Sequence, residues 1–337
     1  MERYNFYNNG FPNYDIQFPK IERGEEYKPS EALICAVNVA LMLQKPLLLT
    51  GHPGTGKSEL AYHIAKHFDL GEVLFFSTRS DSVMTDLLYQ YHSLAHFHNV
   101  NISGNQIALT AEYIEKQFIT YVALGRAICD SVVENTKPRV VLIDEIDKAP
   151  RDLPNDILSI IETMSFEVQE LKTATDTNFS YYNKGYNSIN NNKIQKPVVI
   201  LTSNSEKNLP EAFLRRCVFF NIEMPNQKEM MEILLAKKKI FPDLHSEEAN
   251  AFINIFIIIR EMVNGKKPTT YELIVWVWWM RKQGLMPSDV YNVDRESKDI
   301  DIQKRNYIIF SGISILAKEV YDLNAITDAI KYNNLPR

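Results

Sequence analysis

The feature that most constrains the fold is the segment 51–58, which reads Gly-His-Pro-Gly-Thr-Gly-Lys-Ser. It fits the spacing G-x-x-x-x-G-K-[ST], in which glycines let backbone N–H groups close around a polyphosphate. Lys57 would bring a mobile positive charge to the phosphates, and the hydroxyl of Ser58 would take a position on Mg²⁺. A helix that begins near Lys57 would point the positive end of its dipole at the same anion. The predicted nucleotide-binding residues are Gly51, His52, Pro53, Gly54, Thr55, Gly56, Lys57, Ser58 and Glu59.

The residues on either side supply the setting that such a loop needs. Residues 46–50 form a short apolar run that ends at a glycine, which is typical of a buried parallel strand. Residues 58–68 carry apolar side chains at helical spacing. The order strand, glycine-rich loop, helix therefore predicts a phosphate-binding loop rather than an ordinary turn.

Composition places the chain among globular proteins. Its 337 residues suffice for two domains, and 45% hydrophobic with 23% charged residues is ordinary. The net charge of −5 gives no general attraction for nucleic acid, although a local basic patch stays open. The longest apolar stretches, 251–259 and 273–280, are too short to span a bilayer, and no secretion signal begins the sequence. With Cys35, Cys129 and Cys217 lacking metal-ligand spacing, we expect reduced thiols in the cytoplasm.

The remaining pattern divides the chain into three parts. After an extended arm at 1–27, apolar strands alternate with helices, which predicts a parallel sheet with helices on both faces. We expect these strands at 47–50, 73–77, 139–143 and 197–202. Residues 98–111 are expected to form a loop or hairpin, and the Asn-rich residues 172–196 a polar surface insertion.

From Pro225 onward the strand pattern stops and only helical patterns follow. They cover 226–240, 246–263, 269–283 and 305–320, with a charged loop at 289–304. The predicted domains are the arm at 1–27, an α/β nucleotide-binding domain at 28–224 and an all-helical lid at 225–337.

Two acids complete a hydrolytic site. Residues 140–143 are four apolar residues, and Asp144 and Glu145 follow them at the carboxyl end of the expected strand, where ligands bind in open α/β sheets. Asp144 would hold Mg²⁺ through its water shell, and Glu145 would orient and polarise the attacking water. Asn204, which follows the strand at 197–202, would hydrogen-bond that water or the terminal phosphate.

In this order the motifs GHPGTGKS, VVLIDEIDKAP, LTSN and LPEAFLRRC resemble those of an AAA+ ATPase. The stretch DEIDKAPRDLPNDILSIIETM followed by FEVQEL resembles the MoxR-like branch. The resemblance covers about residues 29–283 and implies a P-loop NTPase sheet with a C-terminal helical lid. It implies that Lys57 and Ser58 bind nucleotide and Mg²⁺, that Asp144 and Glu145 are the magnesium-binding acid and the catalytic base, and that Asn204 is the sensor asparagine.

The resemblance further implies an assembly. Its arginine finger falls on Arg216, with Arg215 as the alternative, and it would reach the terminal phosphate of the adjacent subunit. This implies a homo-oligomeric ring, most simply a hexamer, and a protein partner with a von Willebrand A-type domain. The sequence departs from the family at the second-sensor arginine, where Lys267 or Tyr271 would have to substitute.

We therefore expect an ATP hydrolase that uses Mg²⁺ and couples turnover to assembly, activation or remodelling of a protein complex. Two alternatives stay open. One is the motor subunit of a nucleic-acid-processing or phage-defence complex, and DNA-stimulated hydrolysis would favour it. The other is a nucleotide-gated scaffold with little turnover, against which the pair Asp144 and Glu145 argues. Because the sequence lacks the N-K-x-D motif of GTPases, ATP is favoured over GTP.

Overall fold

A computed structural model of the chain describes residues 18–20, 22–103, 110–133, 136–174, 183–185, 195–294, 296–332 and 335. The chain forms two compact units. The α/β unit comprises residues 29–51 and 57–222, and the helical unit comprises 1–28, 52–56 and 223–337. The arm predicted at 1–27 and the insertion predicted at 172–196 lie largely outside the described residues. The domain boundaries read from the sequence stay a prediction.

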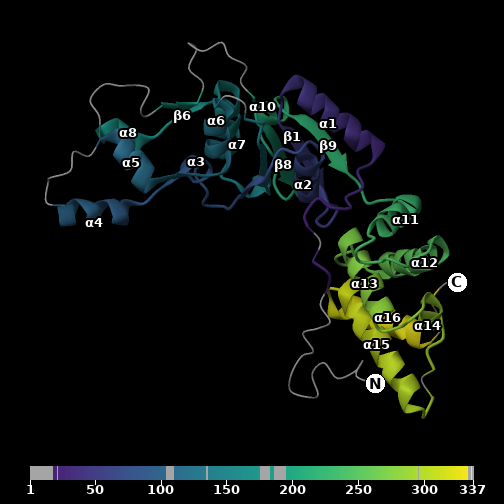
Figure 1. The fold of residues 1–337 in the computed structure, drawn as a ribbon. Helices are drawn as coiled ribbons and strands as arrows, with labels where there is room; N and C mark the ends of the chain where they lie inside the picture. The colour runs from purple at the N-terminus through teal and green to yellow at the C-terminus, as the bar shows by residue number, and fades with distance from the viewer. Residues whose placement is uncertain are drawn as a thin grey trace. The chain divides into compact units, whose positions relative to one another are not determined.

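The α/β unit is built on a five-stranded parallel sheet, which confirms the predicted fold class (Figure 1). The strand order is β2-β5-β8-β1-β9. The strands are β1 (Leu47–Gly51), β2 (Leu74–Ser77), β5 (Val140–Asp144), β8 (Val198–Ser203) and β9 (Val218–Ile222). Strand β8 thus lies between β1, which leads into the phosphate-binding loop, and β5, which ends in the two acids.

Register aligns the ends of these three strands. Leu49 of β1 is opposite Thr202 of β8, and Ile143 of β5 is opposite Leu201. The apolar run of β5 is fully buried because helices cover both faces of a parallel sheet. Polar residues that follow each strand consequently meet at one edge of the sheet.

Helices flank the sheet and follow the loops that connect its strands. They are α1 (Glu31–Leu43), α2 (Lys57–His67), α3 (Met84–Leu88), α6 (Ala123–Ser131), the 3₁₀ turn η1 (Ile146–Lys148), α7 (Leu153–Thr163) and α10 (Glu211–Leu214). The predicted cap of α1 forms, since Ser30 Oγ accepts from the backbone N–H of Leu33 at 3.3 Å. Helix α2 starts at Lys57, as the loop motif requires.

The unit also contains two pairs of short antiparallel strands and three further helices. Strands β3 (Tyr89–Tyr91) and β4 (Ile119–Tyr121) pair antiparallel, as do β6 (Ser165–Glu167) and β7 (Asn183–Gly185). The helices are α4 (Ser93–Ser103), α5 (Ala111–Phe118) and α8 (Gln169–Ala174). The loop or hairpin expected at 98–111 is therefore wrong at 98–103, where α4 continues.

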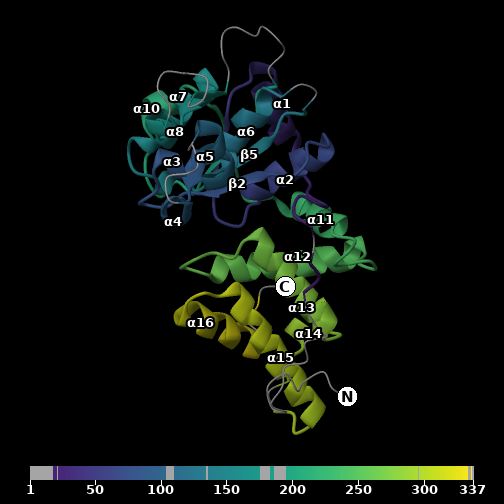
Figure 2. The same cartoon turned by 60° about the vertical axis from the view of Figure 1, so that its left-hand side comes forward.

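The helical unit contains a separate apolar core, and Figure 2 shows its helices. They are α11 (Gln227–Ala236), α12 (Ser246–Met262), α13 (Thr270–Lys282), α14 (Pro287–Tyr291), α15 (Ile300–Leu316) and α16 (Val320–Lys331). Trp276 of α13 is fully buried and packs edge-on against Phe252 of α12, with ring centroids 5.6 Å apart. Among the described residues, no helix has the length and apolar character needed to cross a bilayer.

Candidate functional site

The loop between β1 and α2 has the backbone that its sequence predicts. Gly54 has φ 76° and Gly56 has φ 87°, in the left-handed region that residues with a Cβ rarely adopt. Thr55 Oγ1 donates a hydrogen bond of 2.8 Å to the carbonyl of His52 and fixes the turn between them. These glycines are therefore a requirement of the turn itself.

The ammonium of Lys57 is held where water has little access. Its Nζ donates to the carbonyl of Gly51 at 2.8 Å, and only 6% of the residue is exposed. Burial lowers the pKa of Lys57 from its usual value, and the negative charges of Asp144, Asp147 and Glu145 oppose that effect. A partly desolvated cation gains more from a bound anion than a hydrated one would.

Asp144 collects hydroxyl groups from two other elements. Ser58 Oγ, at the start of α2, donates to Asp144 Oδ1 at 2.7 Å. Thr202 Oγ1, near the end of β8, donates to the same oxygen at 2.5 Å. Carboxylate and hydroxyl oxygens are the ligands that Mg²⁺ accepts, so this donor set fits that ion. The described residues hold no group of three or more His, Cys, Asp or Glu that would bind a metal without a nucleotide.

Glu145 is held by three hydrogen bonds in a left-handed backbone conformation, with φ 57° and ψ 47°. Its N–H donates to Thr202 Oγ1 at 3.0 Å. Its Oε1 accepts from Asn204 Nδ2 at 3.1 Å, and its Oε2 accepts from Lys148 Nζ at 2.7 Å. A non-glycine residue in this region is strained, and such strain persists where the surroundings fix it, as at functional sites.

Three residues in this network were not predicted from the sequence. Thr202 bridges the two acids, and Lys148 binds Glu145. Asp147 is 3% exposed, and its Oδ2 accepts from the backbone N–H groups of Asn204 and Glu206. The signal for Lys148 was its position three residues after Glu145, because side chains at i and i+3 of a 3₁₀ turn lie on one side.

Four other predicted residues have exposed side chains. Arg216 forms an exposed ion pair with Glu162 of α7 at 3.5 Å, and Arg215 binds Glu211 one turn earlier. In the helical unit, Lys267 is exposed and Tyr271 of α13 is 60% exposed. The structure thus gathers Lys57, Ser58, Asp144, Glu145 and Asn204. Arg215, Arg216, Lys267 and Tyr271 lie on the surface of their units.

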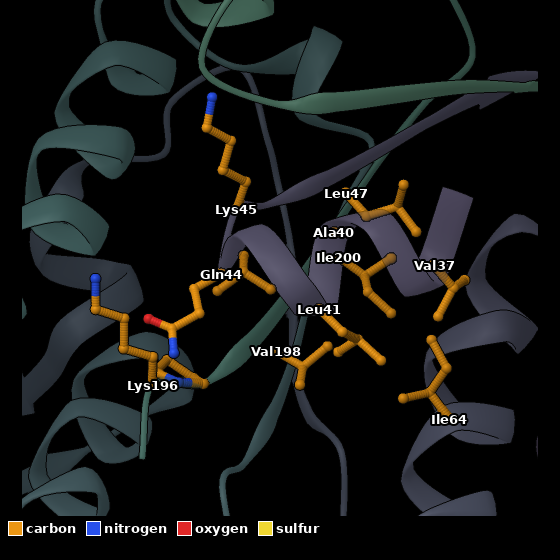
Figure 3. Close-up of a pocket in the computed structure, with 12 residues that line it drawn as sticks. Val37, Ala40, Leu41, Gln44, Lys45, Leu47, Ile64, Lys196, Val198 and Ile200 are labelled. Carbon is orange, nitrogen blue, oxygen red and sulfur yellow. The ribbon is translucent and has the colours of Figure 1, made fainter. Parts of the chain in front are cut away.

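A cavity on the other side of the α/β unit does not match the predicted chemistry. It has a volume of about 50 Å³ and lies between α1 and the first residues of β1 and β8. Figure 3 shows Val37, Leu41, Ile64 and Ile200 facing it, with the ammonium groups of lysines at its edge directed away. Nucleotide-sized sites measure about 300–1,000 Å³. This cavity is an apolar packing gap at the amino end of the strands.

Fold and site together define a P-loop NTPase with one strand inserted between the loop strand and the acidic strand. Residues 46–217 match the family model "AAA domain (dynein-related subfamily)", which is slightly more than half of the chain. The chain belongs to this family of AAA+ domains. AAA+ domains are nucleotide-hydrolysing modules that bind ATP with Mg²⁺ and typically assemble into rings.

Solved structures give only distant likenesses. Two variants of RuvB from Thermotoga maritima align at TM-score 0.39, with 16% and 17% identity. They cover 89% and 88% of this chain and 80% and 79% of their own. PCH-2 from C. elegans aligns at TM-score 0.39 with 16% identity, over 84% of this chain and 66% of its own. No curated protein sequence matches the chain. The family model and the strand order carry the assignment, and these superpositions add nothing to it.

Proposed function

We propose that the chain is a MoxR-like ATP hydrolase whose turnover remodels or activates a partner protein complex in the cytoplasm. The observation that carries the proposal is the arrangement of five side chains at the carboxyl ends of β1, β5 and β8. They are Lys57, Ser58, Asp144, Glu145 and Asn204, joined by hydrogen bonds of 2.7 Å between Ser58 and Asp144 and 3.1 Å between Asn204 and Glu145.

Each residue has a role that its contacts suit. The loop 51–58 and Lys57 bind the phosphates of ATP, and Ser58 and Asp144 hold Mg²⁺, which when bound neutralises phosphate charge. Glu145 orients the attacking water and accepts its proton. Its carboxylate suits this role because Glu145 directly follows the buried strand β5 and is hydrogen-bonded to the amide of Asn204. Asn204 holds Oε1 of Glu145 so that the carboxylate keeps one orientation.

The decisive variant is Glu145→Gln, which keeps the shape of the side chain and removes its basicity. We expect kcat for ATP to fall by roughly 10²-fold or more while ATP affinity is retained. Lys57→Ala should instead abolish ATP binding. Glu112→Gln, an exposed acid of α5, is the matched control. Wild-type turnover by Glu145→Gln would exclude Glu145 as the base, and absence of turnover in the wild-type chain would favour the scaffold alternative.

We also propose a ring, most simply a hexamer, in which Arg216 of one subunit serves the site of the next. Arg216 is exposed and its ion pair with Glu162 is 3.5 Å long, so little holds it in place. Arg216→Ala should leave ATP affinity intact and lower hydrolysis only in the assembled state. When wild-type and Arg216→Ala subunits are mixed, turnover should fall by more than the fraction of Arg216→Ala subunits in the mixture. If Arg215→Ala does this instead, the finger is Arg215.

The partner that we propose is a protein with a von Willebrand A-type domain. Glu145→Gln with ATP should hold the assembled state long enough to capture it. The partner is identified by mass spectrometry of the proteins that copurify with tagged Glu145→Gln in ATP. Tagged Lys57→Ala, which should not bind ATP, is the matched control. Recovery of nucleic-acid-processing proteins, together with DNA-stimulated turnover, would favour the motor alternative.

A further inference from the structure

The carboxylate of Glu145 is restrained by a lysine that also lines an open pocket. Lys148 Nζ lies 2.7 Å from Glu145 Oε2, and both side chains are about one-third exposed, at 39% and 32%. The bond is formed across the 3₁₀ turn η1, where Lys148 N–H donates to the carbonyl of Glu145 at 2.9 Å. A hydrogen bond from the ammonium raises the pKa of Lys148, so the lysine stays charged. The ammonium of Lys148 is hydrogen-bonded to Oε2 of Glu145, an oxygen that a water molecule would otherwise contact.

The pocket beside this ion pair has a volume of about 580 Å³ and lies wholly within the α/β unit. Its charged lining residues are Lys148, Arg151, Lys207 and the buried Asp147, which gives three positive charges against one negative. Asp147 Oδ2 accepts two backbone N–H groups, while its Oδ1 is buried without a hydrogen-bond partner. Because Lys148 is already paired with Glu145, the excess positive charge of the lining comes from Arg151 and Lys207, against Asp147.

The remaining lining favours a peptide over a nucleic acid. Pro150, Pro154, Pro210 and Leu209 form an apolar wall. None of the lining residues is aromatic, so the lining offers no surface on which a base would stack. A pocket of this volume admits a few side chains rather than a polynucleotide strand. A glutamate side chain fits this lining, because its carboxylate can pair with the cations and its methylene carbons can pack on the apolar wall.

We propose that this pocket binds an acidic segment of a partner protein, which draws Lys148 away from Glu145 and thereby accelerates hydrolysis. The flexible stem of Lys148 and its one-third exposure allow that exchange of carboxylates. The proposal rests on Glu145 being the base. Lys148 is a positioning residue, because it acts on the reaction only through Glu145.

Kinetics of the full chain test the restraint. Lys148→Met should raise the basal kcat by roughly two- to five-fold, the range that one partly exposed ion pair spans, with KM for ATP unchanged. Lys148→Arg, which keeps the ion pair, should return kcat to the wild-type value. The matched control is Lys137→Met, because Lys137 also binds a surface carboxylate, Asp69, in the same unit. An unchanged or lower kcat in Lys148→Met overturns the restraint.

Binding of a labelled short poly-glutamate peptide tests the pocket without nucleotide, at constant ionic strength. The peptide should bind the wild-type chain, bind Arg151→Ser/Lys207→Ser more weakly, and stimulate wild-type hydrolysis but not that of Lys148→Met. Equal stimulation of Lys148→Met overturns the proposal, as does tighter binding of oligothymidylate than of the peptide. If the wild-type chain binds the peptide but hydrolyses no ATP, the proposed function fails while the pocket stands.

Discussion

Ser58 Oγ donates a hydrogen bond of 2.7 Å to Asp144 Oδ1, across 86 positions of sequence. The first residues of α2 and the last residue of β5 are thereby joined. Thr202 Oγ1 donates to the same carboxylate oxygen, so residues from two other segments orient this acid. Under the proposed function, Ser58 and Asp144 would supply two oxygen ligands to a magnesium ion.

Asp144→Asn should weaken Mg²⁺-dependent ATP binding while leaving Mg²⁺-free binding nearly unchanged. The amide keeps the size of the carboxylate but removes the charge that attracts the ion. We expect a loss of about 10–100-fold in apparent Mg²⁺ affinity. Titration of a fluorescent ATP analogue with Mg²⁺, and again in EDTA, measures both quantities. Asp130→Asn, at an ion pair with Arg139, is the control, and equal Mg²⁺ dependence in the two variants would contradict the role of Asp144.

Thr202→Val should destabilise the α/β unit and lower turnover together. Valine fills the same space but cannot donate to Asp144 or accept from the N–H of Glu145, which then lies beside a methyl group. We expect a loss of about 1–3 kcal/mol in the free energy of unfolding. Denaturant unfolding measures it, and Thr163→Val at the exposed end of α7 serves as control. A variant of full stability and full kcat would show that Thr202 is dispensable.

Phe166→Ala should loosen both antiparallel strand pairs of the α/β unit, β3 with β4 and β6 with β7. Phe166 of β6 is 4% exposed, and its ring centroid lies 6.4 Å from that of Tyr89 and 6.0 Å from that of Tyr121. Loss of the ring should cost about 3–5 kcal/mol. Hydrogen exchange at β3 and β4 should accelerate with that at β6. The control is Phe219→Ala, whose side chain is 56% exposed and should change stability by about 0.5 kcal/mol or less. Faster hydrogen exchange in β6 alone would show that the two strand pairs are stabilised independently of each other.

Sequence patterns predicted the elements with strong local signals. The strands β1, β2, β5 and β8 lie within two residues of their expected ranges. Strands β1, β5 and β8 are largely buried apolar runs, whereas Phe75 of β2 is 46% exposed. Strand β9 was not predicted. Its residues alternate between partly buried and exposed, as on an edge strand, and its parallel pairing with β1 is a long-range contact.

Predictions were weaker where geometry depends on distant partners. The loop motif and the acids could be recognised because their spacing is local. Thr202 could not be assigned, because its role follows from the register that sets it beside β5 and the left-handed turn at Glu145. In the helical unit, α15 begins at Ile300, inside the loop expected at 289–304, since its first turn is polar and only its later turns are apolar.

Lys57→Met should make the chain more stable while it loses ATP binding. Burial lowers the pKa of Lys57, so at pH values just below 10.5 the folded chain binds fewer protons there than the unfolded chain. The free energy of unfolding of the wild type therefore rises as pH approaches the ordinary lysine value of 10.5. Methionine removes the cost of burying the charge, so Tm at pH 7 should rise, and the dependence of Tm on pH as pH approaches 10.5 should flatten.

Thermal unfolding of wild type and Lys57→Met at several pH values checks this, with Lys172→Met, at an exposed pair with Glu167, as control. A lower Tm in Lys57→Met at pH 7, with the pH slope unchanged, would mean that attraction to Asp144, Asp147 and Glu145 outweighs desolvation. The expected result places the cost of this lysine in the folded state without ATP, where binding of phosphate would recover it. A site that is destabilising when empty and favourable when filled is what a nucleotide-dependent switch requires.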